Sequence, residues 1–422
     1  MEQKIYNEYV EILKEELLPA MGCTEPIAVA YAAAVAVQAL GEKPESVEVN
    51  VSANIIKNVK SVVVPCTGGL RGIGAAVCAG IVAGCPEKEL EILEEITGEQ
   101  KVEMKKMLDT MPMIIRESDK EYIFDIQIKA CAGGHSGYVE IAGFHTNVIC
   151  VKKDDEIIRE KAYEEQGSSC ATDRSLLTVE KIIEFADCVD VADVEEVLQR
   201  QIDYNWAIAE EGMTGKWGAA IGKTLMEAYG NSVHNRAKAM AAAGSDARMN
   251  GCELPVVINS GSGNQGMTTS LPVIVYAKEL NVSKEMMLRA LVVSNLITIH
   301  MKTGIGRLSA YCGAISAGCG AGAGICYLYG GRAYEISHVI VNAVAINSGV
   351  VCDGAKASCA AKIASAVEAG LLGLQMQKNG KQFYGGDGLV EKGVENTIRN
   401  IGELAKKGMR ETDKTIIQIM TR

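Results

Sequence analysis

The stretch LSAYCGAISAGCGAGAGICYLYGG, residues 308–331, decides how the second half of the chain must be built. It carries no charged residue and is long enough to cross a bilayer, yet seven of its residues are glycine and few are large aliphatics. Small side chains let helix backbones approach one another closely. We therefore expect a buried, tightly packed helix and loop here, in a protein that does not span a membrane.

Helical periodicity surrounds this stretch from residue 172 onward, in LLTVEKIIEFADCV, WGAAIGKTLMEAYG and KEMMLRALVVSNLITIHM. The later helical runs are rich in Ala and Gly, and the whole chain has only four phenylalanines. The sequence predicts a mainly helical Ala/Gly-rich bundle for residues 169–422.

The first part of the chain has a different pattern. Apolar and polar residues alternate over residues 45–53 and 122–129, which predicts half-buried strands. GYVEIAGFHTNVICVKKDDEIIREKA predicts strands joined by a polar turn at Asp154 and Asp155, and SVVVP, residues 61–65, predicts another strand. The predicted fold class is α+β, with a mixed α/β domain containing an antiparallel sheet at residues 1–168 and a boundary in the polar EEQGSSCATD.

The charge balance excludes some partners. The chain has 53 acidic and 42 basic residues and a net charge of -11, and no basic stripe is present to neutralise phosphates. We expect neither nucleic acid nor a membrane as a partner. The first 22 residues carry charges throughout and have helical spacing, unlike a signal peptide, so a cytoplasmic location is expected. A homodimer is expected as the commonest soluble assembly.

In a reducing compartment, fourteen cysteines are core thiols, metal ligands or catalytic groups rather than disulfides. Most lie in apolar runs, where cysteine packs as a small hydrophobe. Four have unusual neighbours: Cys23 in MGCTEP, Cys312 in RLSAYCG, and Cys352 and Cys359 in VCDGAKASC. Because the chain has only five histidines, none four residues from another, cysteine is the available soft metal ligand.

The spacing of Cys352 and Cys359 permits two interpretations. In an unbroken helix they would be about 10.5 Å apart along the axis, too far to share one small cluster. Asp353 and Gly354 supply a break that could fold the segment back. From spacing alone, two core thiols on one helix face remain as good an interpretation as two metal ligands.

Cys23 and Thr24 precede a strong helical run with Pro26 in its first turn. A thiol at a helix N-terminus has a lowered pKa and could act as a base. Asp246 and Arg248 in SDARM are interpreted as a structural ion pair without a chemical role.

The motifs PAMGCTEPIAVA, SANIIKN, HTN, MTGKWG, SDARM, NSGSGNQG, RLSAYCGA and VCDGAKASCA occur together over nearly the whole chain. Together they resemble the L-cysteine desulfidase family, which is related to the alpha chain of iron–sulfur L-serine dehydratases. The resemblance implies an oxygen-sensitive [4Fe–4S] cluster that is held by three cysteines and leaves one iron open to substrate. It also implies β-elimination of L-cysteine to pyruvate, ammonia and sulfide.

By position, the resemblance implies that Cys312, Cys352 and Cys359 are the cluster ligands. Cys23, from the first domain, then completes the site as the catalytic group that removes the substrate's Cα proton. An arrangement with Cys23 as a ligand and Cys359 as a packing residue stays open.

The amino-acid substrate needs partners for its charged ends. NSGSGNQG, residues 259–266, can present backbone N–H groups to a carboxylate or phosphate, although a plain helix-entry loop has the same composition. SANIIKN and FHTN add polar residues that we expect at strand ends. With the resemblance, the predicted substrate-binding residues are Thr24, Asn54, Lys57, Asn58, His145, Asn147, Ser260, Ser262, Asn264 and Gln265.

Three other functions remain open. An L-serine dehydratase would use the same mechanism, since serine and cysteine differ only in the leaving atom. A pyridoxal-phosphate lyase would use SGSGNQG as a phosphate cradle and would need a Schiff-base lysine among Lys216, Lys302 and Lys356. A non-catalytic thiol or metal sensor would use the four cysteines without turnover.

Overall fold

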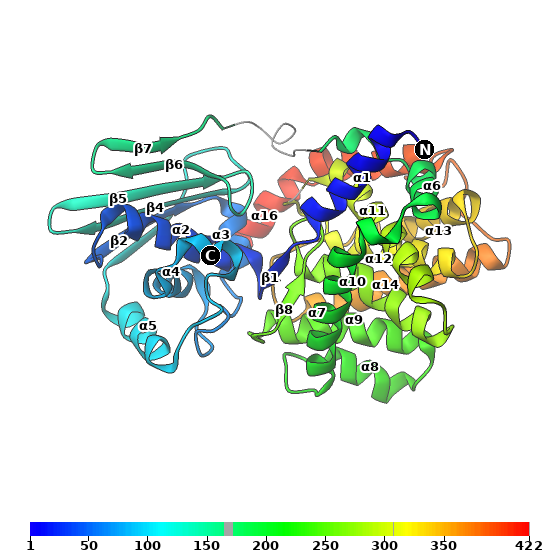
Figure 1. Ribbon diagram of the computed structural model, residues 1–422, viewed down its shortest axis with the longest axis horizontal. Coiled ribbons are helices and arrows are strands. Elements are labelled where there is room, and N and C mark those ends of the chain that lie inside the picture. Colours follow the sequence, from blue (N-terminus) through cyan, green and yellow to red (C-terminus); the bar gives the residue numbers. More distant parts are fainter. Residues whose placement is uncertain (164–171, 307, 422) are drawn as a thin grey trace.

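A computed structural model describes residues 1–163, 172–306 and 308–421 of the chain. It confirms the α+β fold class, because a sheet region and a mainly helical region lie side by side (Figure 1). The predicted domain boundary at residue 168 lies outside the described residues, so that division of the chain stays a prediction.

The strands are β1 (Pro19–Met21), β2 (Ser46–Val51), β3 (Met113–Glu117), β4 (Asp125–Ala132), β5 (His135–Ala142), β6 (Val148–Lys153), β7 (Glu156–Glu160) and β8 (Pro255–Val257). The large sheet has the order β3-β2-β4-β5-β6-β7. Only the β2–β3 pair in it is parallel; the other neighbours are antiparallel. β1 and β8 form a separate antiparallel pair where the two regions meet.

The helices of the first part are α1 (Gln3–Glu16), α2 (Thr24–Leu40), α3 (Ala53–Val59), α4 (Gly72–Ala83) and α5 (Gly98–Thr110). Those of the second part are α6 (Val179–Cys188), α7 (Glu195–Met213), α8 (Ile221–Tyr229), α9 (Val233–Met249), α10 (Gly263–Glu279), α11 (Lys284–Ile305), α12 (Gly313–Leu328), α13 (Ala333–Ile346), α14 (Cys359–Lys378), α15 (Val394–Glu403) and α16 (Arg410–Thr421). Short turns of other helix types lie at Pro86–Glu91, Arg174–Leu176, Val191–Asp193 and Leu404–Gly408.

The alternating patterns predicted most of the sheet correctly. In β2, Val47, Val49 and Val51 are buried in the core of the sheet region, as period-2 alternation requires. The polar turn between β6 and β7 has Asp154 in the left-handed region at φ 52°.

The strand predicted at residues 61–65 is wrong. Val63 forms only an isolated bridge with Arg71, because the chain turns back directly after it. The Thr67 hydroxyl donates to the carbonyl of Val64 at 2.7 Å, and the amide of Leu70 donates to that hydroxyl at 3.1 Å. These bonds take up backbone groups that a sheet neighbour would have used.

SANIIKN also differs from its prediction, because it forms α3 rather than the end of a strand. Ile55 and Val59 are both buried and are four residues apart, so helical winding places them on one face against the core. Lys57 and Asn58 therefore project from a helix.

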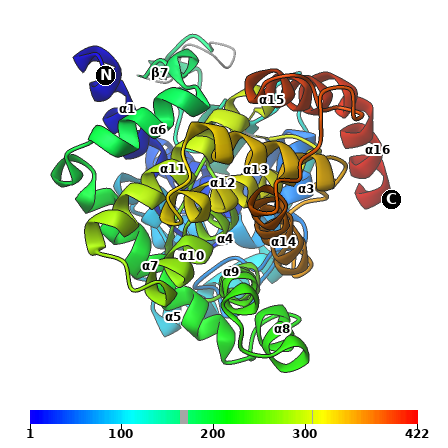
Figure 2. The same cartoon turned by 90° about the vertical axis from the view of Figure 1, so that its right-hand side faces the viewer.

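The glycine-rich stretch confirms the expected buried helix. It forms α12, which lies between α11, α13 and α14 (Figure 2). A Cβ on Gly318 would lie 2.3 Å from the carbonyl oxygen of Ala366 in α14, and one on Gly320 would lie 2.5 Å from that of Ser294 in α11. Only glycine permits these helix contacts. Among the described residues, no helix combines the length and apolar character needed to cross a membrane.

Both ends of the chain cross between the two regions. Tyr9 of α1 packs edge-on against Phe185 of α6, with ring centroids 5.3 Å apart, so the first helix belongs to the core of the helical region. At the other end, α16 lies between the two regions (Figure 1) and contacts α3. The ammonium of Lys57 pairs there with the carboxylate of Asp413 at 2.5 Å.

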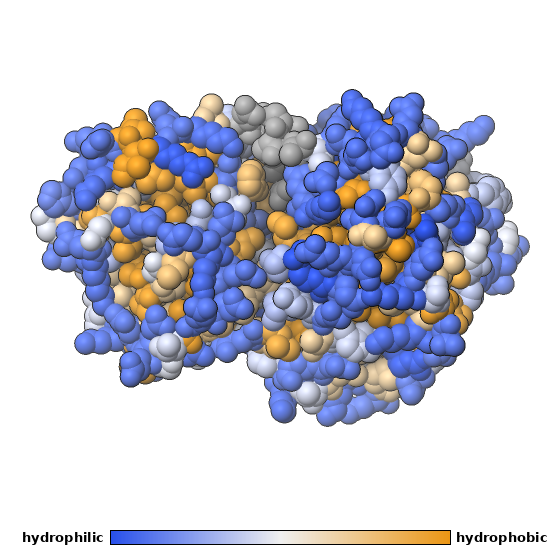
Figure 3. All heavy atoms as spheres, in the orientation of Figure 1, coloured by the Kyte–Doolittle hydropathy of each residue, from blue (hydrophilic) through white to orange (hydrophobic). Residues whose placement is uncertain are grey.

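The surface of the sheet region carries apolar patches, one of them near β6 and β7 (Figure 3). Ile157 and Ile158 of the edge strand β7 are exposed, between the charged side chains of Glu156 and Arg159. Charged residues on an edge strand discourage open-ended pairing with other chains. The expected homodimer stays a prediction.

Candidate functional site

A cavity of about 110 Å³ brings together side chains from both regions. α2 and α3 of the sheet region contribute one wall, and the helical region contributes the rest. The lining residues are Cys23, Glu25, Lys57, Asn58, Arg248, Met249, Ser262, Asn264, Gln265, Lys302, Leu308, Ser309, Tyr311, Cys312, Gly313, Ala314, Cys352, Gly354, Ala355, Cys359, Lys362 and Ile363. All four cysteines singled out in the sequence are among them.

Cys312 and Cys352 lie beside each other across an isolated antiparallel bridge that joins Tyr311 to Val351. The amide of Cys312 donates to the carbonyl of Val350 at 3.1 Å, and the amide of Cys352 donates to that of Ala310 at 2.6 Å. Cys312 is also the N-cap of α12. These backbone hydrogen bonds thus hold both cysteines at the N-terminus of α12.

Cys359 reaches the same cavity because the chain turns at the Asp353-Gly354 break. Gly354 has φ +93°, and a Cβ there would lie 2.3 Å from the carbonyl oxygen of Lys57. The residues between Cys352 and the start of α14 at Cys359 are not helical. The two cysteines are therefore not two turns apart on one helix.

Burial affects the protonation of two of these thiols, Cys312 and Cys359. The pKa of Cys312 is raised to about 12, mainly by burial and to a smaller extent by the neighbouring Cys352. Burial also raises the pKa of Cys359. Such thiols stay protonated unless a positively charged group binds and displaces the protons.

The donor set has the chemistry of an iron–sulfur site, because cysteine thiolates are the usual ligands of such clusters. Within the described ranges, no group of three or more His, Cys, Asp or Glu side chains is arranged to hold one metal ion. In a [4Fe–4S] cluster each cysteine binds a different iron, so the thiols surround the cluster and do not converge on one point. Cys312, Cys352 and Cys359 around one cavity suit that requirement.

Cys23 is the N-cap of α2, as predicted, but its pKa moves in the opposite direction from the prediction. Its thiol donates to a carboxylate oxygen of Glu25 at 3.1 Å. Burial raises the pKa of Cys23 well above its ordinary value, and the negative charge of Glu25 raises it further, while Arg248 lowers it. The helix N-terminus does not outweigh burial here.

The cavity gathers only some of the predicted substrate-binding residues. Lys57, Asn58, Ser262, Asn264 and Gln265 line it.

Thr24 is buried directly behind the cavity wall, and its hydroxyl is 3.1 Å from both the Glu25 carboxylate and the carbonyl of Gly261. Ser260 does not line the cavity; its hydroxyl donates to the side chain of Asn259 at 2.9 Å.

Asn54, His145 and Asn147 also lie away from the cavity lining. His145 packs edge-on against Phe124, with ring centroids 4.9 Å apart. Asn147 donates to the carbonyl of Ala142 at 2.7 Å and so closes the connection between β5 and β6. These contacts give both side chains of the HTN motif a role in the sheet.

Arg248 and Glu25 are cavity residues that the sequence did not reveal. The predicted ion pair between Asp246 and Arg248 is wrong. Asp246 accepts from the amide of Gly222 at 3.1 Å, whereas Arg248 points into the cavity. Residues two apart on a helix do not face each other, and this spacing could have excluded the pair.

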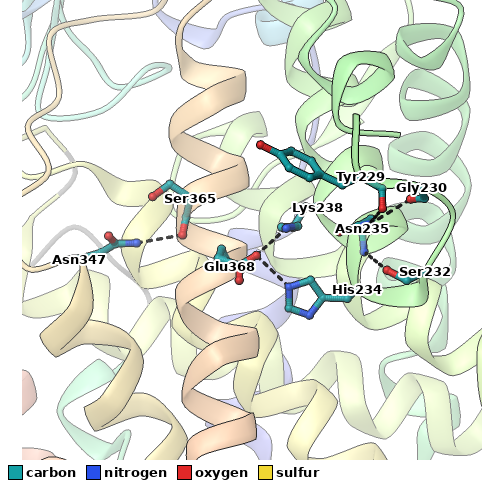
Figure 4. A network of polar contacts seen from close by, with 9 residues as sticks. All are labelled: Tyr229, Gly230, Ser232, His234, Asn235, Lys238, Asn347, Ser365 and Glu368. Carbon is teal, nitrogen blue, oxygen red and sulfur yellow. Dashed lines mark hydrogen bonds and ion pairs between the residues drawn. The ribbon is translucent and has the colours of Figure 1, made fainter. Parts of the chain in front are cut away.

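α14, which begins with Cys359, is anchored to α9 near its middle (Figure 4). Glu368 accepts hydrogen bonds from His234 at 2.8 Å and from Lys238 at 2.6 Å. The hydrogen bond from His234 is the main cause that lowers the pKa of Glu368 to about 2. This contact ties the helix that carries one thiol to the helix that carries Arg248.

Comparisons with known proteins assign the family. A family model described as "Serine dehydratase alpha chain" matches residues 87–418, which include Cys312, Cys352 and Cys359. The chain is 59% identical to a "UPF0597 protein" of Desulfitobacterium hafniense over 99% of this chain and 97% of that relative. It is 50% identical to one of Lachnoclostridium phytofermentans, over 99% and 100%, and 43% identical to one of Treponema denticola, over 100% and 99%. The match over residues 87–418, which is well over half of the chain, places this chain in the serine dehydratase alpha chain family.

Proposed function

We propose that this protein is an iron–sulfur-dependent β-eliminating lyase that converts L-cysteine to pyruvate, ammonia and sulfide. The observation that carries the proposal is the meeting of Cys312, Cys352 and Cys359 with Cys23 in one buried cavity. The first three would hold a [4Fe–4S] cluster. Membership of a dehydratase family supports the same class of reaction.

When bound, the cluster would supply an open iron as a Lewis acid toward the leaving atom of the substrate. The thiolate of Cys23 takes the Cα proton, and the electrons of that C–H bond form the new Cα–Cβ double bond as the C–S bond breaks. Sulfide leaves with that bonding pair. The aminoacrylate product tautomerises to an imine, and water hydrolyses the imine to pyruvate and ammonia.

The carboxylate of Glu25 holds the thiol of Cys23 in position for this step. Because the pKa of Cys23 is raised, its thiol is protonated at neutral pH. The hydrogen bond to Glu25 gives the thiol proton an acceptor at 3.1 Å, and Asn58 Nδ2 donates to the other carboxylate oxygen at 3.1 Å. Cys23 acts as the base once this proton has been lost, so the reaction needs the thiolate form of Cys23.

L-Serine is the second candidate substrate, and the description of the matching family favours it. Elimination from serine uses the same residues, with water as the leaving molecule. The pyridoxal-phosphate alternative would have to use Lys302, which lines the cavity, since Lys216 is exposed and Lys356 pairs with Asp353.

Anaerobic purification tests the proposal. We expect brown protein with a broad charge-transfer absorption, bound iron and acid-labile sulfide, and release of sulfide and pyruvate from L-cysteine. Pyruvate from L-serine without sulfide from L-cysteine would assign the dehydratase instead. A yellow protein with a sharp aldimine band would indicate pyridoxal phosphate, and colourless protein with stoichiometric zinc that is inert toward both amino acids would contradict the proposal.

A further inference from the structure

Arg248 is a buried cation that lacks an anionic partner. Its side chain is 2% exposed, its Nε donates to the carbonyl of Gly22 at 2.8 Å, and its Nη1 donates to Oδ1 of Asn264 at 3.1 Å. No carboxylate in the part of the chain that the structure describes pairs with it. Burying a charge without an opposite charge is costly, so the guanidinium is suited to an anion that enters the cavity.

Two of the other cations that line the cavity, Lys57 and Lys362, have carboxylate partners. Lys57 pairs with Asp413, and Lys362 pairs with Asp353. The charge of Lys362 acts on Cys312 and Cys352, whereas that of Arg248 acts on Cys23. An anion bound at Arg248 therefore lies near Cys23, and the thiols expected to bind metal have a cation of their own.

The start of α10 adds backbone donors beside Arg248. Gly263 is needed there, because a Cβ at that position would lie 2.4 Å from Arg248 Nε. The N-cap residue Ser262 lines the cavity, and its side chain does not cap the helix. The amide groups of the first turn and the guanidinium thus favour the same kind of ligand, a carboxylate.

An acceptor for a positive group lies close to this anion site. Gln265 is 6% exposed and lines the cavity, and its Oε1 is buried without a hydrogen-bond partner. Its amide group packs against Gly313, where a Cβ would lie 2.7 to 2.9 Å from the amide atoms. A buried acceptor without a donor suits a ligand ammonium group.

We propose that Arg248 and Gln265 bind the amino-acid end of the substrate, with the carboxylate on the guanidinium and the ammonium on Gln265 Oε1. The inference rests on the proposed function for the substrate class, L-α-amino acids, and is independent of the leaving atom. Seating the carboxylate on Arg248 holds Cα at the Cys23 end of the cavity.

Binding of ligands that cannot react tests this arrangement. L-Alanine has both charged groups and no leaving group, L-alaninol lacks the carboxylate, and propionate lacks the ammonium. Their dissociation constants are measured by calorimetry on anaerobically purified wild-type, Arg248→Gln and Gln265→Met proteins. In the wild type, loss of the carboxylate is expected to weaken binding about 10- to 100-fold, the range for a charge-assisted hydrogen bond.

In Arg248→Gln, L-alanine is expected to bind no better than L-alaninol, while L-alaninol binds as it does to the wild type. In Gln265→Met, binding of L-alanine is expected to weaken, and binding of propionate is expected to stay unchanged. Lys57→Gln is the matched control, and its preference for L-alanine over L-alaninol is expected to persist. Loss of that preference in Lys57→Gln, with retention in Arg248→Gln, would overturn the assignment.

Equal weakening of all three ligands in Arg248→Gln would also overturn it, because that result indicates a structural role. If Arg248→Gln does not fold, Arg248→Lys is used instead, because it keeps the charge and loses the forked pair of donors. It is expected to weaken the binding of L-alanine and to leave the binding of L-alaninol unchanged. Wild-type protein that binds L-alanine without eliminating from cysteine or serine would refute the proposed function and leave this inference intact. Wild-type protein that binds no amino acid would refute the inference.

Discussion

The two walls of the cavity are built in different ways. The wall from the helical region, the thiol wall, carries Cys312 and Cys359 at the starts of α12 and α14. Its third thiol, Cys352, follows the bridge that joins Tyr311 to Val351. The wall from the sheet region, the proton wall, carries Cys23 and Glu25 joined by a hydrogen bond. The cysteine thiols of the two walls thus have different neighbours. In the proposed reaction one wall holds metal and the other moves a proton.

Removing a thiol from the thiol wall is expected to have the largest effect. Single changes of Cys312, Cys352 or Cys359 to Ala should abolish the brown colour and all elimination activity, since each removes a cluster ligand. Iron content and absorption of anaerobic protein measure this. Cys78→Ala is the control, because Cys78 is buried in the sheet-region core and does not line the cavity. A coloured Cys359→Ala protein would show that Cys359 only packs.

Removing the thiol of the proton wall should separate the two tasks. Cys23→Ala is expected to keep its iron and to lose about 10²- to 10⁴-fold in kcat, the usual contribution of a positioned base. Iron analysis and single-turnover kinetics on the same preparation measure both quantities. Loss of iron in this variant would make Cys23 a ligand and would erase the distinction between the walls.

Cutting the contact behind the proton wall should have a smaller effect. Asp413→Asn leaves the buried ammonium of Lys57 without its carboxylate, and because Asp413 is itself partly exposed we expect the free energy of unfolding to fall by about 2 kcal/mol. Chemical denaturation measures the loss. Glu411→Gln breaks an exposed pair with Lys414 in the same helix and should leave the free energy of unfolding nearly unchanged. Equal effects of the two changes would refute a special role for Asp413.

Changing the charge of the proton wall should move a pH profile. The negative charge and the hydrogen bond of Glu25 raise the pKa of Cys23, so Glu25→Gln should lower that pKa. Since the reactive form is the thiolate, kcat/KM rises with pH up to the pKa of Cys23, and its acid limb should move to lower pH in Glu25→Gln. An unchanged limb with a lower maximum would mean that Glu25 acts on another group.

More of the sheet than of the candidate site could be predicted from the sequence. Valine alternation in β2 gives the register of a strand because one face is buried, and the same rule failed at residues 61–65, where the Thr67 hydroxyl stabilises a turn. Local patterns describe neighbours along the chain. They do not show that the carbonyl of Lys57 meets Gly354, a contact on which the position of Cys359 depends.

The site residues divide in the same way. The position of Cys23 at a helix start could be predicted, but the direction of its pKa depends on burial and on Glu25, which are properties of the folded chain. The sequence does not show that the side chain of Arg248 lines the cavity, because its hydrogen-bond partners, Gly22 and Asn264, come from other parts of the sequence. His145 shows the converse, since it belongs to a motif of the resemblance and does not line the cavity.

The ion pair between Lys57 and Asp413 has a consequence for how the protein is made. The cavity needs residues from Cys23 to Ile363, and the wall that carries Lys57 is held in place by a helix that begins only at Arg410. A ribosome releases the chain in order, so the ion pair between Lys57 and Asp413 can form only after Asp413 has left the exit tunnel. Until then the nascent chain presents its thiols without the finished enclosure. Loading of the proposed cluster into the finished cavity would therefore follow the synthesis of α16.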